Sequence, residues 1–235
     1  IGKTEKYYSE TLYRLPNNFL CFTGEEDAKF VKEGPFTQNN YITFGSFNNF
    51  SKITDETIKI WSSILNIIPN SRLVLKTSRK NLEFNRYIKL FLIKGIEEKR
   101  INCINYISNY RDHLELYNKI DIALDTFPYN GATTTFEALW MGVPVITTKG
   151  NSHLSSVGAS ILTNLELQNF IAKDTNQYID LAKKNSTDID YLKVLRLSLR
   201  EKLKKSSLCD GVSFAKDVEN AYKSIYEDYY SKQKY

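Results

Sequence analysis

The sequence predicts a doubly wound α/β domain, in which helices cover both faces of a parallel sheet. Short apolar runs with the features of buried strands alternate along the chain with segments whose apolar residues recur at helical spacing. The 235 residues are also enough to bury a full core. Alternating strands and helices imply right-handed crossovers and a parallel sheet, whose ligands bind beyond the carboxyl ends of the strands.

The elements can be placed in order from residue 41 onward. Strands are expected at 41–47, 72–76, 101–106, 120–124 and 144–147, with helices at 54–68, 81–96, 112–119 and from 133. Thr54 can cap the first of these helices, and Pro69 ends it. The large apolar residues Trp61, Phe136 and Trp140 are expected in the core. After residue 152 the chain is expected to be helical throughout, at 153–162, 175–185, 187–205 and 211–230.

The stretch 125–144, DTFPYNGATTTFEALWMGVP, is the most informative part of the sequence. It follows an expected strand, turns through Asn130 and Gly131, and enters a helix whose first turn holds Thr133 and Thr134. A helix start offers unpaired N–H groups and a partial positive charge, which favour a phosphate. Glu137 follows one turn later, within reach of a sugar hydroxyl attached to that phosphate. The spacing predicts a nucleotide-diphosphate site at the carboxyl end of a parallel strand.

Composition sets wider limits on the function. The chain is 42% hydrophobic and 25% charged, without an apolar run long enough to span a bilayer. Its cysteines, Cys21, Cys103 and Cys209, lack metal-ligand spacing and are expected to be buried, reduced thiols, which favours a cytoplasmic location. Net charge is +5, and residues 191–235 hold 10 Lys/Arg against 6 Asp/Glu. We interpret this basic end as a solvated helical face, with nucleic-acid binding as the weakest alternative.

Several segments together resemble the carboxyl-terminal catalytic half of the O-linked N-acetylglucosamine transferases. They are FGSFNNFSKI at 44–53, Trp61 with PNS at 69–71, HLELY at 113–117, DIALDTFPYNG at 121–131 and LWMGVPV at 139–145. The similarity is greatest to the bacterial and SPINDLY-type branch. It implies a GT-B glycosyltransferase, in which two Rossmann-like domains face each other and the second, represented by this chain, binds the nucleotide-sugar.

The resemblance also implies roles for particular residues. Lys52 corresponds to the lysine that contacts the diphosphate and stabilises the leaving group, and it is the catalytic candidate. The hydroxyls of Thr133 and Thr134 would bind the diphosphate, beside Asn130 and Gly131. The remaining donor-binding candidates are Asn49, in place of a glutamine, Glu137, in place of a ribose-binding aspartate, and His113, beside the nucleobase.

Three departures from the family pattern affect the expected site. Ala132 replaces a histidine of the animal-type members, which removes one diphosphate donor. Leu116 lies near the position of a base-stacking arginine, so that the base contacts fit neither UDP-N-acetylglucosamine nor GDP-fucose cleanly. Ser156 lies where many bacterial relatives have arginine. A UDP-sugar is the favoured donor.

We therefore expect residues 39–205 to form the nucleotide-sugar-binding domain of an inverting, metal-independent transferase that modifies Ser/Thr hydroxyls of proteins. Residues 1–38 would connect it to a missing amino-terminal half, which holds the general base and can carry tetratricopeptide repeats. Residues 206–235 would form a helix that packs on this domain or on that half. The chain begins with Ile1 rather than Met, which indicates a fragment. The alternative is a non-catalytic nucleotide-sugar-binding or scaffold module.

Two further observations bear on alternative chemistry. The Asp188-Ile189-Asp190 triplet has the D-x-D form of a metal motif, but its place at a helix start favours a capping pair. No metal site is therefore expected. His113 could also be a plain surface residue, and Glu137 could pair with a neighbouring cation on its helix.

Overall fold

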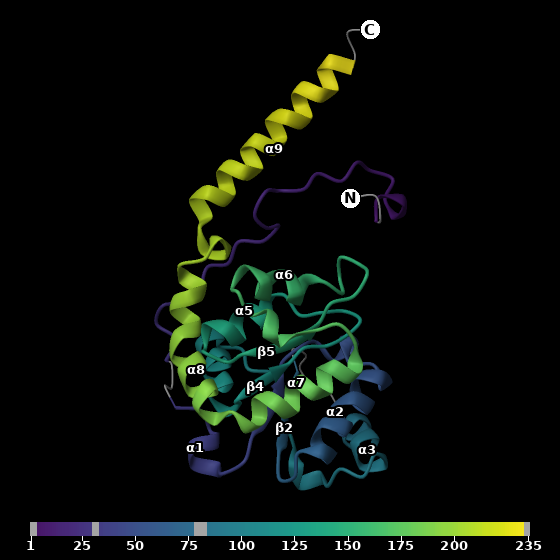
Figure 1. Cartoon of the computed structure of the whole chain (residues 1–235), viewed down its shortest axis with the longest axis vertical. Helices are drawn as coiled ribbons and strands as arrows, with labels where there is room; N and C mark the ends of the chain where they lie inside the picture. The colour runs from purple at the N-terminus through teal and green to yellow at the C-terminus, as the bar shows by residue number, and fades with distance from the viewer. Residues whose placement is uncertain (1–3, 30–32, 78–83, 233–235) are drawn as a thin grey trace. The chain divides into compact units, whose positions relative to one another are not determined.

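The computed structural model describes residues 4–29, 33–77 and 84–232. Contacts divide the chain into two compact units, one formed by Gly24–Lys202 and the other by Ile1–Thr23 with Leu203–Tyr235. Within the described residues, the larger unit holds a six-stranded parallel sheet (Figure 1). Its strands are β1 (Thr43–Ser46), β2 (Arg72–Lys76), β3 (Ile101–Ile104), β4 (Ile122–Leu124), β5 (Val145–Thr148) and β6 (Ile171–Ala172). The predicted α/β fold class is confirmed.

The strand order β3-β2-β1-β4-β5-β6 determines where a ligand can bind. The chain first moves outward from β1 to β3, then returns to β4, which pairs with β1 on its other side. From β4 it moves outward in the opposite direction to β5 and β6. The carboxyl ends of β1 and β4 therefore flank the point where the winding reverses, and ligands of doubly wound sheets bind at such a point.

Helices surround this sheet (Figure 1). They are α1 (Phe36–Asn39), α2 (Asp55–Ile67), α3 (Asn85–Ile93), α4 (Tyr110–Glu115), α5 (Thr133–Trp140), α6 (Val157–Asn164), α7 (Thr175–Thr187) and α8 (Ile189–Lys204). Short 3₁₀ turns join them at η2 (Phe50–Lys52), η3 (Glu98–Arg100), η4 (Leu116–Lys119) and η5 (Gln168–Phe170). Helix α7 packs against α2, β5 and β6, and α5 and α6 both pack against β5.

Helix α2 has the cap, the buried apolar face and the end point that its own sequence predicts. The Thr54 hydroxyl accepts the Thr57 N–H at 3.1 Å, so the predicted cap is confirmed. Trp61 and Ile64 are fully buried on its inner face. Burial of a large apolar side chain stabilises a fold by about 1.5–3 kcal/mol. Asn70, with a φ of 63°, turns the chain toward β2 after the helix ends. Phe136 and Trp140 are also buried, as predicted.

Some predicted boundaries and one element were wrong. The chain is not helical throughout after residue 152, because β6 pairs with β5 through Ile171 and Thr147. A strand of two residues is too short to show a periodicity of its own. Helix α6 starts at Val157 rather than at 153, because Ser152 and Ser155 close a turn with hydroxyls 2.8 Å apart. The first strand starts at Thr43 rather than at 41.

Two further expectations need comment. The helix expected at 81–96 appears as α3, Asn85–Ile93, while residues 81–83 lie outside the described part of the chain. The three cysteines carry free thiols, but burial was wrongly expected, because Cys21 is exposed and Cys103 and Cys209 are partly exposed. Cys103 lies on the edge strand β3, and Cys21 and Cys209 belong to the smaller unit, so none of them lies in the centre of the sheet.

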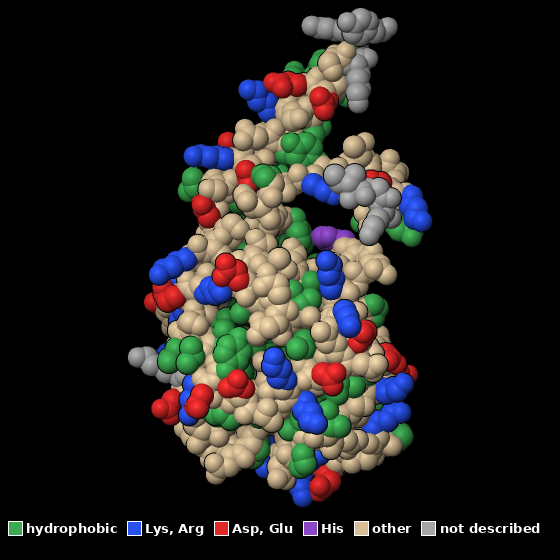
Figure 2. All heavy atoms as spheres, in the orientation of Figure 1, with side chains coloured by type: hydrophobic (Ala, Val, Ile, Leu, Met, Phe, Trp, Pro, Cys, Tyr) green, Lys and Arg blue, Asp and Glu red, His purple; other side chains and the backbone are tan. Residues whose placement is uncertain are grey.

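The smaller unit contains η1 (Glu5–Tyr7), η6 (Ser207–Cys209) and α9 (Gly211–Lys232). The Phe22 N–H donates to the Leu208 carbonyl at 2.8 Å, which joins its two segments. Acidic and basic side chains are both visible along α9 on the face drawn in Figure 2. The sequence of this helix contains both kinds, among them Lys216, Asp217, Lys223 and Glu227. In the described parts of the chain, no helix is both long and apolar enough to cross a bilayer.

Candidate functional site

Asp125 organises the loop that leads from β4 to α5. Its carboxylate oxygen Oδ1 accepts the N–H of Gly131 at 2.6 Å, the N–H of Thr126 at 2.9 Å and the Asn48 side-chain amide at 3.3 Å. The other oxygen accepts the Thr147 hydroxyl at 2.7 Å. Because these donors come from the ends of β1, β4 and β5, one buried carboxylate fixes the loop to three strands. Burial raises the pKa of Asp125 to about 6, against the hydrogen bonds that lower it.

Helix α5 begins at Thr133, as the sequence predicts. Its N-cap is Ala132, which provides no capping side chain, and the Thr133 side chain is exposed. In the described structure the N–H groups of Thr133 and Thr134 have no acceptor, which is the usual state of a helix start. The Thr134 hydroxyl donates to the Asn48 side-chain oxygen at 2.8 Å. Asn48 therefore joins Thr134 to Asp125.

Gly131 is required by close packing in this loop. A Cβ atom at this position would lie 2.5 Å from the Thr134 hydroxyl and 2.7 Å from the Asn48 oxygen. Gly131→Ala is expected to destabilise the protein by about 1–3 kcal/mol, as overpacking does, and to weaken diphosphate binding. Thermal unfolding and calorimetry measure the two effects. Thr133→Ala, at an exposed position, serves as the control and should leave stability within about 0.5 kcal/mol.

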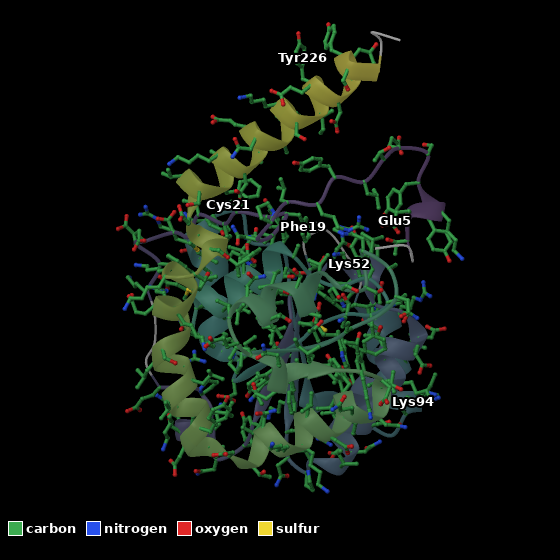
Figure 3. All side chains as sticks on the ribbon, turned by 45° about the horizontal axis from the view of Figure 1, so that its top comes forward. Glu5, Phe19, Cys21, Lys52, Lys94 and Tyr226 are labelled. Atoms are coloured by element: carbon green, nitrogen blue, oxygen red, sulfur yellow. The ribbon has the colours of Figure 1, made fainter. Side chains whose placement is uncertain are left out.

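Lys52, labelled in Figure 3, is the last residue of η2, in the loop that follows β1. Its Nζ donates to the Asn130 carbonyl at 2.8 Å and lies 3.8 Å from the centre of the Tyr129 ring. Burial lowers the pKa of Lys52, and the negative charge of Asp125 partly opposes that shift. The structure thus brings together Lys52 and the 125–134 loop, which are far apart in the sequence.

The remaining members of the loop have structural contacts of their own. The Asn130 side chain is buried and donates to the Thr126 carbonyl at 3.0 Å, so its backbone carbonyl, rather than its amide, meets Lys52. The peptide bond between Phe127 and Pro128 is cis. Asn49 is the N-cap of η2 and accepts the Ser51 N–H at 3.0 Å, which leaves its amide N–H₂ group available to a ligand.

His113 and Glu137 form a buried pair beside this loop. The His113 Nε2 lies 3.0 Å from Glu137 Oε2, and the Tyr117 hydroxyl donates to the same oxygen at 3.0 Å. Tyr117 also donates to the Thr134 carbonyl at 3.2 Å, which connects the pair to the first turn of α5. Burial raises the pKa of Tyr117 well above its ordinary value, so its hydroxyl remains a donor.

This geometry corrects two alternatives considered for these residues. His113 is 9% exposed, so it is not a surface residue. Glu137 is 4% exposed and contacts a histidine and a tyrosine from α4 and η4, not a cation of its own helix. No sequence spacing indicated Tyr117, because its contact with Glu137 is made between two elements.

Besides Tyr117, two further residues of this region were missed from the sequence. Asp125 follows an apolar strand, which was a usable signal, but its hydrogen bonds come from segments distant in sequence. Lys76 is a buried lysine at the carboxyl end of β2 and interacts electrostatically with Glu137. A lysine that follows an apolar run such as Leu73–Leu75 is as common at a solvent-exposed strand end as at a buried one. The sequence therefore contained no sign that Lys76 is buried.

The second histidine of the chain and the D-x-D triplet do not join the cluster. His153 is exposed in the turn before α6. The Asp188 carboxylate accepts the Tyr191 N–H at 3.1 Å, so the capping interpretation of the D-x-D triplet is confirmed. Over residues 4–29, 33–77 and 84–232, no group of three or more His, Cys, Asp or Glu side chains is arranged to hold a metal ion.

The fold defines a class of protein: it is that of the Rossmann-like domain of a GT-B glycosyltransferase. Comparison with known proteins specifies the family. Residues 33–218 match the family model Glycosyl transferase family 41, and the chain belongs to that family. The expected relationship to the O-linked N-acetylglucosamine transferases and SPINDLY proteins is confirmed.

The similar proteins agree with this assignment. The chain is 40% identical over 222 residues to a Solanum lycopersicum protein named as a probable UDP-N-acetylglucosamine–peptide N-acetylglucosaminyltransferase, SPINDLY, covering 94% of this chain and 24% of that protein. It is 29% identical over 191 residues to the Caenorhabditis elegans UDP-N-acetylglucosamine–peptide N-acetylglucosaminyltransferase, covering 81% of this chain and 16% of that protein. The chain thus spans about a quarter or less of the length of these relatives.

A solved structure gives the same result. A mutant O-GlcNAc transferase from Thermobaculum terrenum matches with a TM-score of 0.87 and 32% identity, over 95% of this chain and 42% of that one. Sucrose-phosphate synthase from Thermosynechococcus elongatus matches with a TM-score of 0.58 and 14% identity, over 84% of this chain and 50% of that one, which shows the shared fold alone.

Proposed function

We propose that this chain is the donor-binding half of a glycosyltransferase that transfers N-acetylglucosamine from a nucleotide-sugar to Ser or Thr hydroxyls of proteins. The names of the SPINDLY and Caenorhabditis elegans relatives support a UDP-sugar donor and a peptide acceptor. The general base and much of the acceptor site belong to an amino-terminal half beyond this chain, consistent with the fraction of the relatives that it spans.

The observation that supports this function most directly is the position of Lys52 beside the start of α5. Its Nζ reaches Asn130, three residues before Thr133, at 2.8 Å. When the sugar leaves, negative charge develops on the nucleoside diphosphate. A lysine and the N–H groups of a helix start both stabilise that charge and require no metal ion. We therefore propose a metal-independent reaction, with inversion at the sugar carbon through direct attack by the acceptor hydroxyl.

Nucleotide binding tests this proposal without the amino-terminal half. Calorimetric titration of the chain with UDP and with GDP is expected to show binding of at least one, since the diphosphate groups meet Lys52 and α5. Thr133→Ala, which removes an exposed hydroxyl at the start of α5, is expected to weaken that binding about 10-fold, because hydrogen bonds to charged groups contribute about 1.5–3 kcal/mol. Absence of binding to either nucleotide would contradict the proposal.

The second candidate function is a scaffold module without donor binding. It rests on α9, where the Tyr222, Tyr226 and Tyr229 side chains are 71%, 63% and 59% exposed, and on the missing donor at Ala132. A scaffold would bind neither UDP nor GDP, so the same titration separates the two functions. Transfer by the isolated chain to an acceptor peptide would contradict the assignment of the general base to the other half.

A further inference from the structure

Two of the three cysteines lie next to each other in the smaller unit, although they are far apart in the sequence. Cys21 directly precedes Phe22, whose N–H donates to the Leu208 carbonyl at 2.8 Å, and Cys209 directly follows Leu208. Standard peptide dimensions on either side of this hydrogen bond place the Cα atoms of the two cysteines within about 7 Å of one another. Disulfides join Cα atoms that are about 4.4–6.8 Å apart. The backbones are therefore close enough for a bond between the two sulfur atoms.

The Cys21 thiol lies against the start of α9. A Cβ atom at Gly211, the first residue of that helix, would be 3.8 Å from Cys21 Sγ. Cys209 comes two residues before Gly211, at the end of η6. The Cys21 side chain, labelled in Figure 3, thus lies against the part of the chain that carries Cys209. Both residues are in the thiol state.

Side-chain contacts hold the two segments in this register. The Asn18 amide donates to the Ser207 carbonyl at 3.5 Å, and the Asn17 amide donates to the Asp217 carboxylate at 3.2 Å. Because Ser207 and Asp217 lie on opposite sides of Leu208 in the sequence, these contacts oppose a shift of one segment along the other. Groups that the fold holds together in this way react at a high effective concentration.

The three cysteines differ in their access to an oxidant. Cys21 is exposed and Cys209 is partly exposed, both in the smaller unit. Cys103 lies on β3 of the larger unit, and burial raises the pKa of its thiol to about 11. Since the thiolate is the reactive form, Cys103 is a poor nucleophile at neutral pH. A small oxidant in solution therefore meets Cys21 first, with Cys209 beside it.

We propose that Cys21 and Cys209 form a redox-active dithiol, which a low-molecular-weight disulfide such as oxidised glutathione converts to a disulfide bond. The Cys21 thiolate attacks one sulfur of the oxidant, breaks its S–S bond and releases one glutathione. The Cys209 thiolate then attacks the Cys21 sulfur of the mixed disulfide and releases the second glutathione. Two protein thiols are oxidised, one oxidant molecule is reduced to two thiols, and the two protons pass to glutathione. The bond fixes the segment 17–22 to the start of α9, and a thiol reductant reopens it.

Disulfide mapping of the wild-type chain tests this pairing. The folded chain is treated with oxidised glutathione, the remaining thiols are alkylated, and the linked peptides are identified by mass spectrometry. The Cys21–Cys209 bond is expected to exceed any pairing with Cys103 by at least 10-fold. In urea this preference should disappear, because the entropy of closing a loop depends only weakly on its length. Absence of the bond in the folded chain, or the same proportions with and without urea, would refute the proposal.

Three variants test the roles of the individual cysteines. Cys209→Ser should accumulate glutathione on Cys21, because the thiol that resolves the mixed disulfide is gone. Cys21→Ser should take up glutathione at least 10-fold more slowly, since the exposed thiol is removed. Cys103→Ser is the control and should form the bond with the wild-type yield. Thermal unfolding checks that each variant folds. Equal rates of uptake in Cys21→Ser and Cys209→Ser, or loss of the bond in Cys103→Ser, would contradict the assigned roles.

Discussion

Replacement of Lys52 by methionine is expected to lower the turnover of the whole enzyme by about 10²–10³-fold, the usual effect of removing one group that stabilises charge in the transition state. The residue is half-buried, and its Nζ is directed to the Asn130 carbonyl beside the start of α5. Because the diphosphate gains charge as the sugar leaves, kcat should fall more than KM rises. Single-turnover transfer to an acceptor peptide measures this.

Lys59→Met provides the matched control for this experiment. Lys59 is an exposed lysine on α2, and its replacement removes the same charge without a contact in the loop. Turnover of this variant should remain near the wild-type value. A Lys52→Met enzyme with unchanged kcat, but with weakened donor binding, would show that Lys52 only binds the ground state.

Replacement of Asp125 is expected to have the largest effect on stability. Asp125→Ala leaves the N–H groups of Gly131 and Thr126 and the Asn48 amide without their acceptor, which should cost about 3–5 kcal/mol. Asp125→Asn retains an oxygen at the Oδ1 position and should cost much less. Urea unfolding compares the two variants. Equal losses would contradict the hydrogen-bonding role of this carboxylate.

The free energy of unfolding is also expected to depend on pH through the ionisation of Asp125. The pKa of Asp125 is about 6 in the folded protein, above the ordinary 3.8. The folded state therefore binds the proton more tightly, and ionisation of Asp125 lowers the free energy of unfolding as pH rises between these values. The loss from this group is about 3 kcal/mol, at 1.36 kcal/mol for each pH unit. Asp125→Asn should lack this component.

Unfolding measured at pH 4.5 and at pH 7.5 provides the test for wild type and Asp125→Asn. Burial also raises the pKa of Asp121, to about 7, and acts in the same direction. Asp121 is present in both proteins, so its contribution cancels in the difference between them. An identical pH dependence for the two proteins would show that Asp125 does not titrate in this range.

The sequence predicted those elements of the fold that depend on local signals, and it missed those that depend on contacts between distant segments. Helix α2 and strand β2 were located by their own residues, because a cap, an apolar face and an apolar run are local signals. The start of α5 at Thr133 was also predicted. The phosphate site at this helix start stays a prediction. Strand β6 and the start of α6 were not predicted, because a neighbouring strand and a serine turn define them.

The sequence by itself determined the α/β class, the family and the two segments that meet at the site, Lys52 and the 125–134 loop. These features depend on local periodicity and on motif order, which need no knowledge of the packing. Only the tertiary structure decided the position of Asp125 between three strands, the burial of His113 against Glu137, and the burial of Lys76. The physical reason is that hydrogen bonds and desolvation at these residues come from strands and helices that folding brings together from distant parts of the chain.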